Sequence, residues 1–343
     1  MNCLEIRTAA GECRVVFGAS LEDAAAFLPS RGAGAIVTDT NVRRLFGHRF
    51  PGLPVIEVEP GESSKDLRTV DRLHREFLRL ELDRSSFVTG IGGGVVCDIT
   101  GFAASTYMRG IGFGFVPSTL LAQADASIGG KNGVNVGGVK NVAGTFRQPE
   151  HVIIDGSLLE TLPQAAIRCG LAEIAKHALI AGAELFSFLE RQIAALLSLD
   201  RRAVERVLAE SVGIKAGLVE ADALESGERR KLNFGHTIGH AVELEAGLPH
   251  GEAVAIGMAA AARISAARGS LSERDVRRIS GWLEKAGLPA ALPVPRARLF
   301  ETMRRDKKRH LGTIHFVLLS AIGRAEVVPL AWDELEAYVH DLC

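Results

Sequence analysis

Two histidines four residues apart stand in a segment that could hold a metal ion. His236 and His240 fall in residues 233–240, and they share one face if this segment is helical. His250 follows shortly after, and Glu173 lies upstream at the start of an apolar, helix-like stretch. One carboxylate with two imidazoles suits a catalytic zinc ion. Spacing alone does not determine which side chains bind, and ordinary surface or core histidines would give the same pattern.

A glycine-rich turn at residues 90–94 has the composition of a nucleotide-binding turn. It follows an apolar strand and precedes a predicted helix that contains Asp98. Glycines let backbone N–H groups approach a pyrophosphate, and a helix N-terminus favours its charge. The strict G-x-G-x-x-G pattern fails because Cys97 takes the place of the third glycine. The turn is therefore either a nucleotide site or a structural tight turn, and Asp39, at an earlier strand end, either contacts a ribose or caps a loop.

Several cations stand in glycine-rich or polar segments where an anionic ligand could be held. Ammonium and guanidinium groups suit phosphate and carboxylate. The alternative is that they are ordinary solvated surface charges, which composition cannot separate from binding residues. The cations in question are Arg109, Lys131, Lys140, Lys176, Lys215, Arg229 and the pair Lys307 and Lys308.

The first half of the chain alternates strand-like and helix-like segments. Residues 34–39 form a short apolar run, and residues 66–80 carry apolar side chains at helical spacing. Strands alternating with helices predict a parallel sheet that is covered on both faces. Further strands are expected in the segments Pro-Val-Ile-Glu-Val-Glu-Pro, Phe-Val-Thr-Gly-Ile-Gly, Gly-Phe-Gly-Phe-Val-Pro and His-Val-Ile-Ile-Asp.

The second half is rich in Ala and Leu and is predicted to be mostly helical from residue 164 to about 290. A strand or short hairpin follows at Thr-Ile-His-Phe-Val-Leu-Leu, and then a helix over 333–342. The fold class is thus an N-terminal Rossmann-like α/β domain with a parallel sheet, plus a mostly α-helical C-terminal domain. We expect the α/β domain, with the candidate nucleotide-binding turn, to span 1–160 and the helical domain, with the candidate metal site, to span 161–343.

Composition excludes several classes of protein. The formal net charge is −1, so neither nucleic acid nor an anionic membrane is an expected partner. Five cysteines without C-x-x-C spacing argue against a disulfide framework and favour a reducing compartment. The first residues lack a signal-peptide pattern, and no apolar run reaches membrane-spanning length. A cytoplasmic location is therefore expected.

Ordered motifs along most of the chain resemble the 3-dehydroquinate synthase family of sugar phosphate cyclases. Each motif is short, but together and in this order they are specific. The matching segments are residues 60–65, 92–113, 117–135, 138–146, 170–180, 230–243, 248–258 and 306–308.

The resemblance implies two cofactors and a residue set for each. Glu173, His236 and His250 match the family's zinc ligands, although a similar shell also suits cobalt. The positions matching the family's NAD contacts are Asp39, Glu62, Lys65, Gly93, Gly94, Asp98, Ser118, Thr119, Lys140 and Thr161.

The resemblance also implies a substrate pocket and a homodimer. His240 matches an acid/base or phosphate-contacting residue, and Arg109 matches an arginine that reaches across a dimer interface in family members. The remaining pocket positions are Asp125, Lys131, Asn141, Lys176, Lys215, Arg229, Asn233 and Lys307, with Lys308 as the alternative to Lys307.

The implied reaction converts 3-deoxy-D-arabino-heptulosonate 7-phosphate to 3-dehydroquinate and phosphate, in the shikimate pathway. It proceeds by transient oxidation, phosphate elimination, reduction and aldol closure, so that NAD is regenerated. Another cyclase, of the 2-epi-5-epi-valiolone or 2-deoxy-scyllo-inosose synthase type, and a metal-dependent polyol dehydrogenase are the alternatives. Departures such as His177, where a tyrosine is common, bear on substrate preference more than on reaction class.

Overall fold

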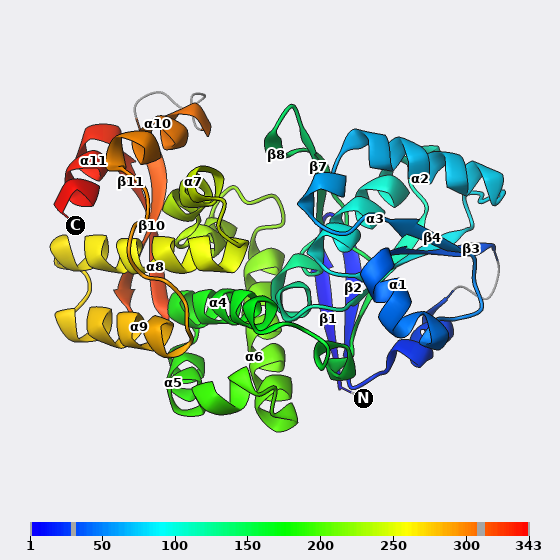
Figure 1. Ribbon diagram of the computed structural model, residues 1–343, viewed down its shortest axis with the longest axis horizontal. Coiled ribbons are helices and arrows are strands. Elements are labelled where there is room, and N and C mark those ends of the chain that lie inside the picture. The colour runs from blue at the N-terminus through cyan, green and yellow to red at the C-terminus, as the bar shows by residue number, and fades with distance from the viewer. Residues whose placement is uncertain (1, 29–31, 307–312, 342–343) are drawn as a thin grey trace. The chain divides into compact units, whose positions relative to one another are not determined.

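A computed structural model describes residues 2–28, 32–306 and 313–341, and the chain forms two compact units (Figure 1). The first unit runs to Leu162 and also includes Ala216–Leu224. The second comprises Pro163–Lys215 and the chain from Glu225 onward. The sequence places a boundary at residue 160, and nothing in it indicates that a nine-residue return segment joins the first unit.

A seven-stranded sheet forms the first unit, in the order β1-β2-β9-β6-β5-β3-β4. Neighbouring strands are parallel except for the antiparallel pair β1 and β2. The predicted parallel sheet is therefore confirmed, and the N-terminal hairpin is an addition that the sequence did not predict. The strands are β1 (Asn2–Thr8), β2 (Gly11–Phe17), β3 (Gly34–Asp39), β4 (Val55–Val58), β5 (Phe87–Gly92), β6 (Gly112–Pro117) and β9 (His151–Ile154).

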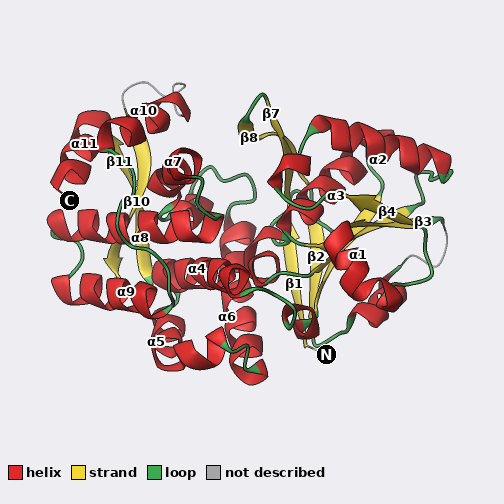
Figure 2. Cartoon of the chain, in the orientation of Figure 1, coloured by secondary structure: helices red, strands yellow, loops and turns green. Residues whose placement is uncertain are grey.

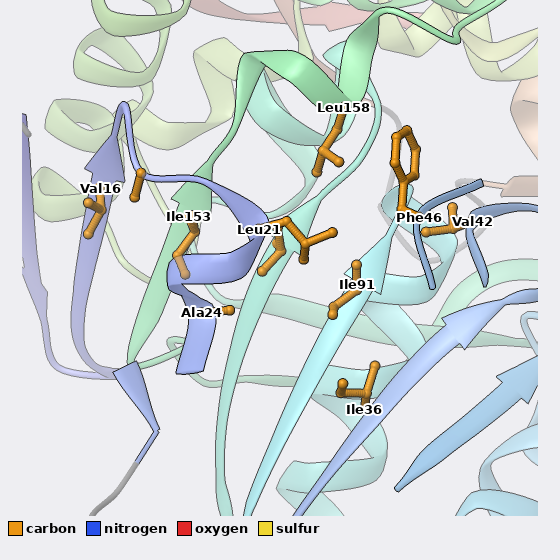
Figure 3. Packing of buried hydrophobic residues seen from close by; sticks show 11 residues of the cluster. Val16, Leu21, Ala24, Ile36, Val42, Phe46, Ile91, Ile153 and Leu158 are labelled. Carbon is orange, nitrogen blue, oxygen red and sulfur yellow. The ribbon is translucent and has the colours of Figure 1, made fainter. Parts of the chain in front are cut away.

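Helices cover both faces of this sheet. A Cβ at Gly90 would lie 3.0 Å from Thr100 Oγ1, so the Gly90 face of β5 packs on α3 (Gly94–Thr106). Ile91 points to the opposite face because side chains alternate along a strand. There it joins an apolar cluster with residues of η1 (Leu21–Phe27), α1 (Thr40–Phe46) and η6 (Gly156–Leu159) (Figure 3). The cluster also includes Val16, Ile36, Val116 and Ile153 from four other strands.

Three strands of the sheet end at one edge. Thr38 of β3 is paired with Ile91 of β5, and Gly92 of β5 with Pro117 of β6. The turns that follow these strands therefore lie next to one another, as the carboxyl ends of parallel strands must. Further helices of this unit are α2 (Leu67–Arg79) and the short helices η2 (Gly47–Arg49), η3 (Glu62–Ser64), η4 (Tyr107–Arg109) and η5 (Ala122–Ala126).

A separate antiparallel hairpin consists of β7 (Lys131–Val136) and β8 (Val139–Phe146). Its ladder is irregular between Val134 and Val136. Residues 131–146 carry matched motifs, but their pattern predicts no strands. The many glycines and polar residues of this segment are unusual for strands, so the alternation that marks a half-buried strand is weak.

The second unit is mostly helical, as predicted (Figure 2). An antiparallel β-hairpin confirms the strand pattern expected near the C-terminus. No helix in the described ranges combines the length and hydropathy needed to span a membrane. The elements are α4 (Gln164–Ala181), α5 (Ala183–Leu197), α6 (Arg201–Ala221, which ends in the first unit), η7 (Glu228–Asn233), α7 (His236–Ala246), α8 (His250–Ala267), α9 (Glu273–Lys285), α10 (Arg296–Asp306), β10 (Thr313–Ala321), β11 (Arg324–Ala331) and α11 (Trp332–Asp341).

Glycines bring α7 and α8 into backbone contact. A Cβ at Gly257 of α8 would lie 1.9 Å from the carbonyl oxygen of Gly235, and one at Gly239 would lie 2.9 Å from that of Ala253. Gly235 has φ +80°, a left-handed conformation that suits glycine. The two helices therefore approach more closely than any pair with side chains at these positions, and each begins with one of the predicted ligand histidines.

Candidate functional site

Glu173, His236 and His250 meet in the second unit, although they come from α4, α7 and α8. Glu173 is fully buried, and its Oε1 lies 3.6 Å from Nε2 of His236 and 3.4 Å from Nε2 of His250. Ligand atoms around a tetrahedral zinc ion stand about 3.3 Å apart, since each bond is about 2.0–2.1 Å long. All three ligand atoms lie within 4.8 Å of one another, so they are spaced as ligands of a single ion.

Glu243 binds the other nitrogen of His250. Its Oε2 lies 3.2 Å from His250 Nδ1, whereas Nε2 of the same ring is directed to Glu173. A carboxylate on the far nitrogen fixes the tautomer and orientation of a metal-binding imidazole. A second group, His240, Glu243 and His250, also has its ligand atoms within 4.8 Å of one another. The Glu243–His250 hydrogen bond favours the first group, because it occupies Nδ1 and leaves Nε2 for the ion.

The electrostatics of this cluster separate the two histidines. Burial, reinforced by the nearby Lys176 ammonium, lowers the pKa of His236 well below 6.5. Burial also acts to lower the pKa of His250, but its hydrogen bonds to Glu173 and Glu243 outweigh this and raise the pKa to about 10. His236 is therefore neutral and ready to ligate, whereas the site around His250 attracts positive charge.

Three cations of the expected substrate pocket are buried in the second unit. Lys176 is buried and pairs with Glu173 Oε2 one helical turn away. Arg229, in η7, is only 1% exposed, and Lys215 is 6% exposed. Cations are seldom buried to this extent unless they serve an ion pair or an anionic ligand.

Two further predicted residues lie in the same unit. His240 is exposed, and its ring centroid is 5.1 Å from that of His236. Asn233, at the end of η7, donates from Nδ2 to Glu225 Oε1 at 2.6 Å. Lys307 and Lys308 lie outside the described residues.

His177 replaces the tyrosine expected at its position and is wholly buried. Its Nδ1 lies 2.7 Å from Ser211 Oγ of α6, and Ser211 is equally buried. Ser211 stands one helical turn before Lys215, so the pair links the α4 face that carries Glu173 to the α6 face that carries Lys215. The substitution therefore keeps a polar contact in the interior.

The glycine turn of the first unit begins α3. Gly93 is the N-cap residue of α3, and no side chain caps it, so the first N–H groups of the helix are available to an anion. Cβ atoms at Gly93 and Gly94 would lie 3.2 Å from Thr119 and 3.1 Å from Ala126, respectively. Ser118 follows the neighbouring strand and donates its backbone N–H to Gly92 O at 2.8 Å. The structure thus places Gly93, Gly94, Ser118 and Thr119 together.

Charged groups beside this turn form a connected set. Lys65 Nζ lies 2.5 Å from Asp98 Oδ2 and 2.6 Å from Asn141 Oδ1, and Lys65 is 6% exposed. Glu62, three residues before Lys65, is exposed and accepts a hydrogen bond from Asn135 at 2.8 Å. The structure therefore brings together four predicted residues, Glu62, Lys65, Asp98 and Asn141. Asn135, which the sequence did not predict as a site residue, connects Glu62 to Asn141.

Asp39 and Thr161 have less distinctive surroundings. Asp39 Oδ1 accepts from Val42 N at 2.9 Å and so caps α1. This is the capping role that the sequence left open, and the carboxylate still stands at the edge where β3 ends. Thr161 is exposed in the turn after η6.

Four predicted residues stand on or beside short elements of the first unit. Arg109 is exposed and has φ +66°, directly after Met108 with φ +47°. Two successive left-handed residues are uncommon outside functional turns. Asp125 is half-buried in η5, whereas Lys131 and Lys140 are exposed on the β7–β8 hairpin.

Sequence reasoning missed Glu243 and Asn135. Glu243 stands three residues after His240 and seven after His236, so helical spacing could have placed it on the histidine face. Asn135 closes one of the matched motifs, but its contacts depend on an irregular ladder, for which the sequence has no marker.

Comparison with known proteins agrees with this arrangement. The family profile described as 3-dehydroquinate synthase N-terminal matches residues 55–169, and the one described as 3-dehydroquinate synthase C-terminal matches 170–309. A 3-dehydroquinate synthase of Pelobacter propionicus is 45% identical over 316 residues, covering 89% of this chain and 88% of the relative. That of Acidithiobacillus ferrooxidans is 42% identical over 339 residues, covering 93% of both chains.

Solved structures share the two-unit fold. ValA, a 2-epi-5-epi-valiolone synthase from Streptomyces hygroscopicus with NAD+ and Zn2+ bound, superposes with a TM-score of 0.88 at 32% identity, covering 96% of each chain. A 2-deoxy-scyllo-inosose synthase complexed with carbaglucose-6-phosphate, NAD+ and Co2+ gives a TM-score of 0.87 at 26% identity, covering 99% of this chain and 100% of the other.

The fold and the carboxylate–histidine cluster define an enzyme of the sugar phosphate cyclase class. Profiles for both halves and relatives at 42–45% identity narrow that class. The chain belongs to the 3-dehydroquinate synthase family.

Proposed function

We propose that this chain converts 3-deoxy-D-arabino-heptulosonate 7-phosphate to 3-dehydroquinate and phosphate, with NAD and a divalent metal ion as cofactors. The observation that carries the proposal is the meeting of Glu173, His236 and His250 around one point, in a chain that matches the synthase family in both halves. The bound NAD+ with Zn2+ or Co2+ in the two solved cyclases supports the same cofactors here.

The metal would be held by Glu173, His236 and His250, and their spacing fits a zinc ion. A neutral His236, a buried carboxylate and an oriented His250 suit zinc, and they suit cobalt equally. When bound, the ion supplies Lewis-acid polarisation of substrate hydroxyl oxygens. Three protein ligands leave a position for those oxygens.

NAD would be held in the first unit at the carboxyl edge of the sheet. The start of α3 fits a pyrophosphate, because no side chain caps Gly93 and the first N–H groups of the helix can donate to an anion. NAD supplies the transient hydride acceptor, and its NADH form returns the hydride. The proposed contacts are Asp39, Glu62, Lys65, Gly93, Gly94, Asp98, Ser118, Thr119, Lys140 and Thr161.

The other polar residues would bind and orient the substrate. Arg109, Lys131 and Asn141 would hold the phosphate, and Arg229, Lys215 and Asn233 the carboxylate and hydroxyl end. The buried guanidinium of Arg229 is suited to paired hydrogen bonds with a carboxylate. His240 would hold or move a proton beside the metal ligands. Asp125, Lys176 and Lys307 are proposed as further substrate contacts.

A homodimer would complete this site, with Arg109 acting in the neighbouring copy. Support comes from the exposed, left-handed turn at Arg109 and from exposed apolar side chains on the β7–β8 hairpin, of which Val139 is 52% and Val142 57% exposed. Mixing the inactive variants Arg109→Ala and His250→Ala should then restore about a quarter of wild-type activity, since mixed dimers contain one complete site. No recovery would place Arg109 in its own subunit. A cytoplasmic location is proposed from the biosynthetic role of the family.

Two rival functions make different predictions. The sister cyclases act on sugar phosphates without a carboxylate. In such an enzyme no substrate carboxylate would be present for Arg229, Lys215 and Asn233 to bind. A metal-dependent polyol dehydrogenase would accumulate NADH and would need no phosphate-binding residues. The 42–45% identity to 3-dehydroquinate synthases, against 26–32% to the two cyclases, favours the synthase.

The test is to incubate the zinc-loaded protein and NAD with the heptulosonate phosphate and to follow phosphate and dehydroquinate together. Equal release of both, without net NADH, is expected. His250→Ala should lose zinc and turnover, whereas His315→Ala, at an exposed position of β10, should retain both. Phosphate release only from a sugar phosphate that lacks the carboxylate would refute the substrate assignment.

A further inference from the structure

An irregularity in the β7–β8 hairpin exposes a group of residues proposed to bind ligands. Val134 is paired with Ala143 and Val136 with Val139, so Asn135 of β7 faces three residues of β8, 140–142. Such a bulge turns the extra residues out of the ladder and redirects their side chains. Lys140 and Asn141, both exposed, lie in it.

Asn135 makes the hydrogen bonds that hold this bulge. Its Oδ1 accepts from the backbone N–H of Asn141 at 2.9 Å, and its Nδ2 donates to Glu62 Oε1 at 2.8 Å. Its backbone N–H donates to Lys65 O at 2.8 Å. Asn135 therefore bonds to both Lys65 and Asn141, which are 76 positions apart in the sequence.

A second connection closes the network. Lys65 Nζ donates to Asn141 Oδ1 at 2.6 Å and pairs with Asp98 at 2.5 Å. Asn141 has φ +54°, a left-handed conformation that asparagine tolerates better than most residues. Its main chain and its side chain are thus each fixed by a different partner, Asn135 and Lys65.

We infer that Asn135 is a positioning residue that couples NAD binding to substrate binding. This inference rests on the proposed function, which assigns Glu62 and Lys65 to NAD and Asn141 to the substrate phosphate. A ligand that shifts Glu62–Lys65 or the bulge shifts the other segment as well, because Asn135 bonds to both. The second ligand then meets residues already in their bound arrangement, and the coupling is reciprocal because it is a free energy shared by both sites.

The experiment measures the substrate KM of the zinc-loaded enzyme at low and saturating NAD, and the NAD KM at low and saturating substrate. In the wild type each ligand should lower the KM of the other by about tenfold, the shift expected for coupling through one or two hydrogen bonds. In Asn135→Ala this factor should fall to about one to two, while kcat with both ligands saturating changes by less than about threefold. Val136→Ala, next to it on the exposed hairpin, is the matched control and should retain the wild-type factor.

A conservative rescue separates positioning from simple destabilisation. Asn135→Asp keeps the acceptor for Asn141 but sets a carboxylate against Glu62, so the coupling should be lost. Adding Glu62→Gln supplies a donor for that carboxylate and should restore the coupling factor, with the Glu62→Gln single variant as reference.

Three outcomes are distinct. The inference is overturned if Asn135→Ala keeps the coupling factor of the wild type, or if the wild type itself shows a coupling factor near one. Either result leaves the proposed function in place. A loss of kcat with both KM values unchanged also overturns it, because Asn135 would then act on the reacting groups. Absence of any phosphate release by the wild type overturns the proposed function, and the inference with it.

Discussion

The carboxylate of Glu243 binds His250 on the ring nitrogen opposite to the one that faces Glu173. One imidazole therefore stands between two carboxylates that have different tasks. Glu173 shares the point where an ion would lie, whereas Glu243 only orients the ring and favours positive charge beside it.

Replacing Glu243 with Gln should lower zinc affinity by about 10- to 100-fold, the usual effect of removing a carboxylate behind a metal-binding histidine. Competition with a zinc-binding dye would measure the change, and circular dichroism would check the fold. Glu284→Gln, at an exposed position of α9, is the control and should bind zinc as the wild type does. Wild-type affinity in Glu243→Gln would mean that the hydrogen bond does not orient the ligand.

The contact between α7 and α8 predicts that Gly257→Ala destabilises the protein by about 1–3 kcal/mol, a typical cost of overpacking. The added Cβ would meet the Gly235 carbonyl at 1.9 Å, and backbone cannot move aside as a side chain can. Zinc affinity should also fall, since the helices that carry His236 and His250 must separate.

The control for this change is Gly281→Ala, in the middle of α9. Apart from its own helix backbone and chain neighbours, no atom of the described residues lies within 4 Å of a Cβ there, so the variant should gain about 0.5–1 kcal/mol from helix propensity. Chemical denaturation of both variants would measure the difference. A Gly257→Ala protein as stable as the wild type would show that α7 and α8 can shift freely.

Buried His151 predicts loss of stability in acid. Burial, with a smaller contribution from Arg14, lowers its pKa to about 4, and its ring stacks on Phe87 with centroids 5.3 Å apart. Nε2 has no hydrogen-bond partner within the described part of the chain. The unfolded chain takes up a proton near pH 6.5 but the folded one only near pH 4, so stability present above pH 6.5 declines as the pH falls between these values. The total loss is about 3 kcal/mol.

Urea unfolding from pH 7.5 to 4.5 would measure this decline in the wild type and in His151→Leu. The difference between the two isolates His151 from all other groups that titrate. The leucine variant should lose less stability over this range, and equal slopes would show that His151 is protonated in the folded protein.

Arg229→Lys should raise the KM for the substrate by at least about tenfold, because an ammonium cannot form the paired hydrogen bonds of a guanidinium with a carboxylate. The KM for NAD should stay near the wild-type value. Arg230→Lys is the control, because Arg230 donates to the Glu225 carbonyl and has no proposed ligand role. Equal increases in both KM values would argue against a substrate contact for Arg229.

The sequence predicts the parallel sheet well because its strands are short apolar runs between turn residues. The apolar run over 34–39 predicts a strand, and β3 has these bounds. The predicted helix over 66–80 agrees closely with α2 (Leu67–Arg79), which Asp66 caps by accepting from Thr69 N. Local spacing is sufficient for such elements, since each needs only one apolar stripe facing a neighbour.

The sequence is less informative where contacts between distant segments decide the structure. His236 and His240 look equivalent by spacing, yet it is His236 whose Nε2 lies 3.6 Å from Glu173 Oε1, in a position that the contact of Gly235 with Gly257 sets by fixing how α7 lies on α8. For Asp39, the sequence is sufficient to predict the local contact that caps α1. It is not sufficient to predict how far the carboxylate lies from a bound ligand. Asn135 could not be identified, because its partners belong to another segment of the chain.

The glycine contact between α7 and α8 also affects how this protein can evolve. The separation of His236 and His250 is set by main chain against main chain, not by the sizes of neighbouring side chains. Substitutions around the pocket can therefore accumulate, and alter which sugar is accepted, while the two imidazoles keep their spacing. A library that randomises pocket residues but conserves Gly235, Gly239 and Gly257 would be a sound starting point for redesigning specificity.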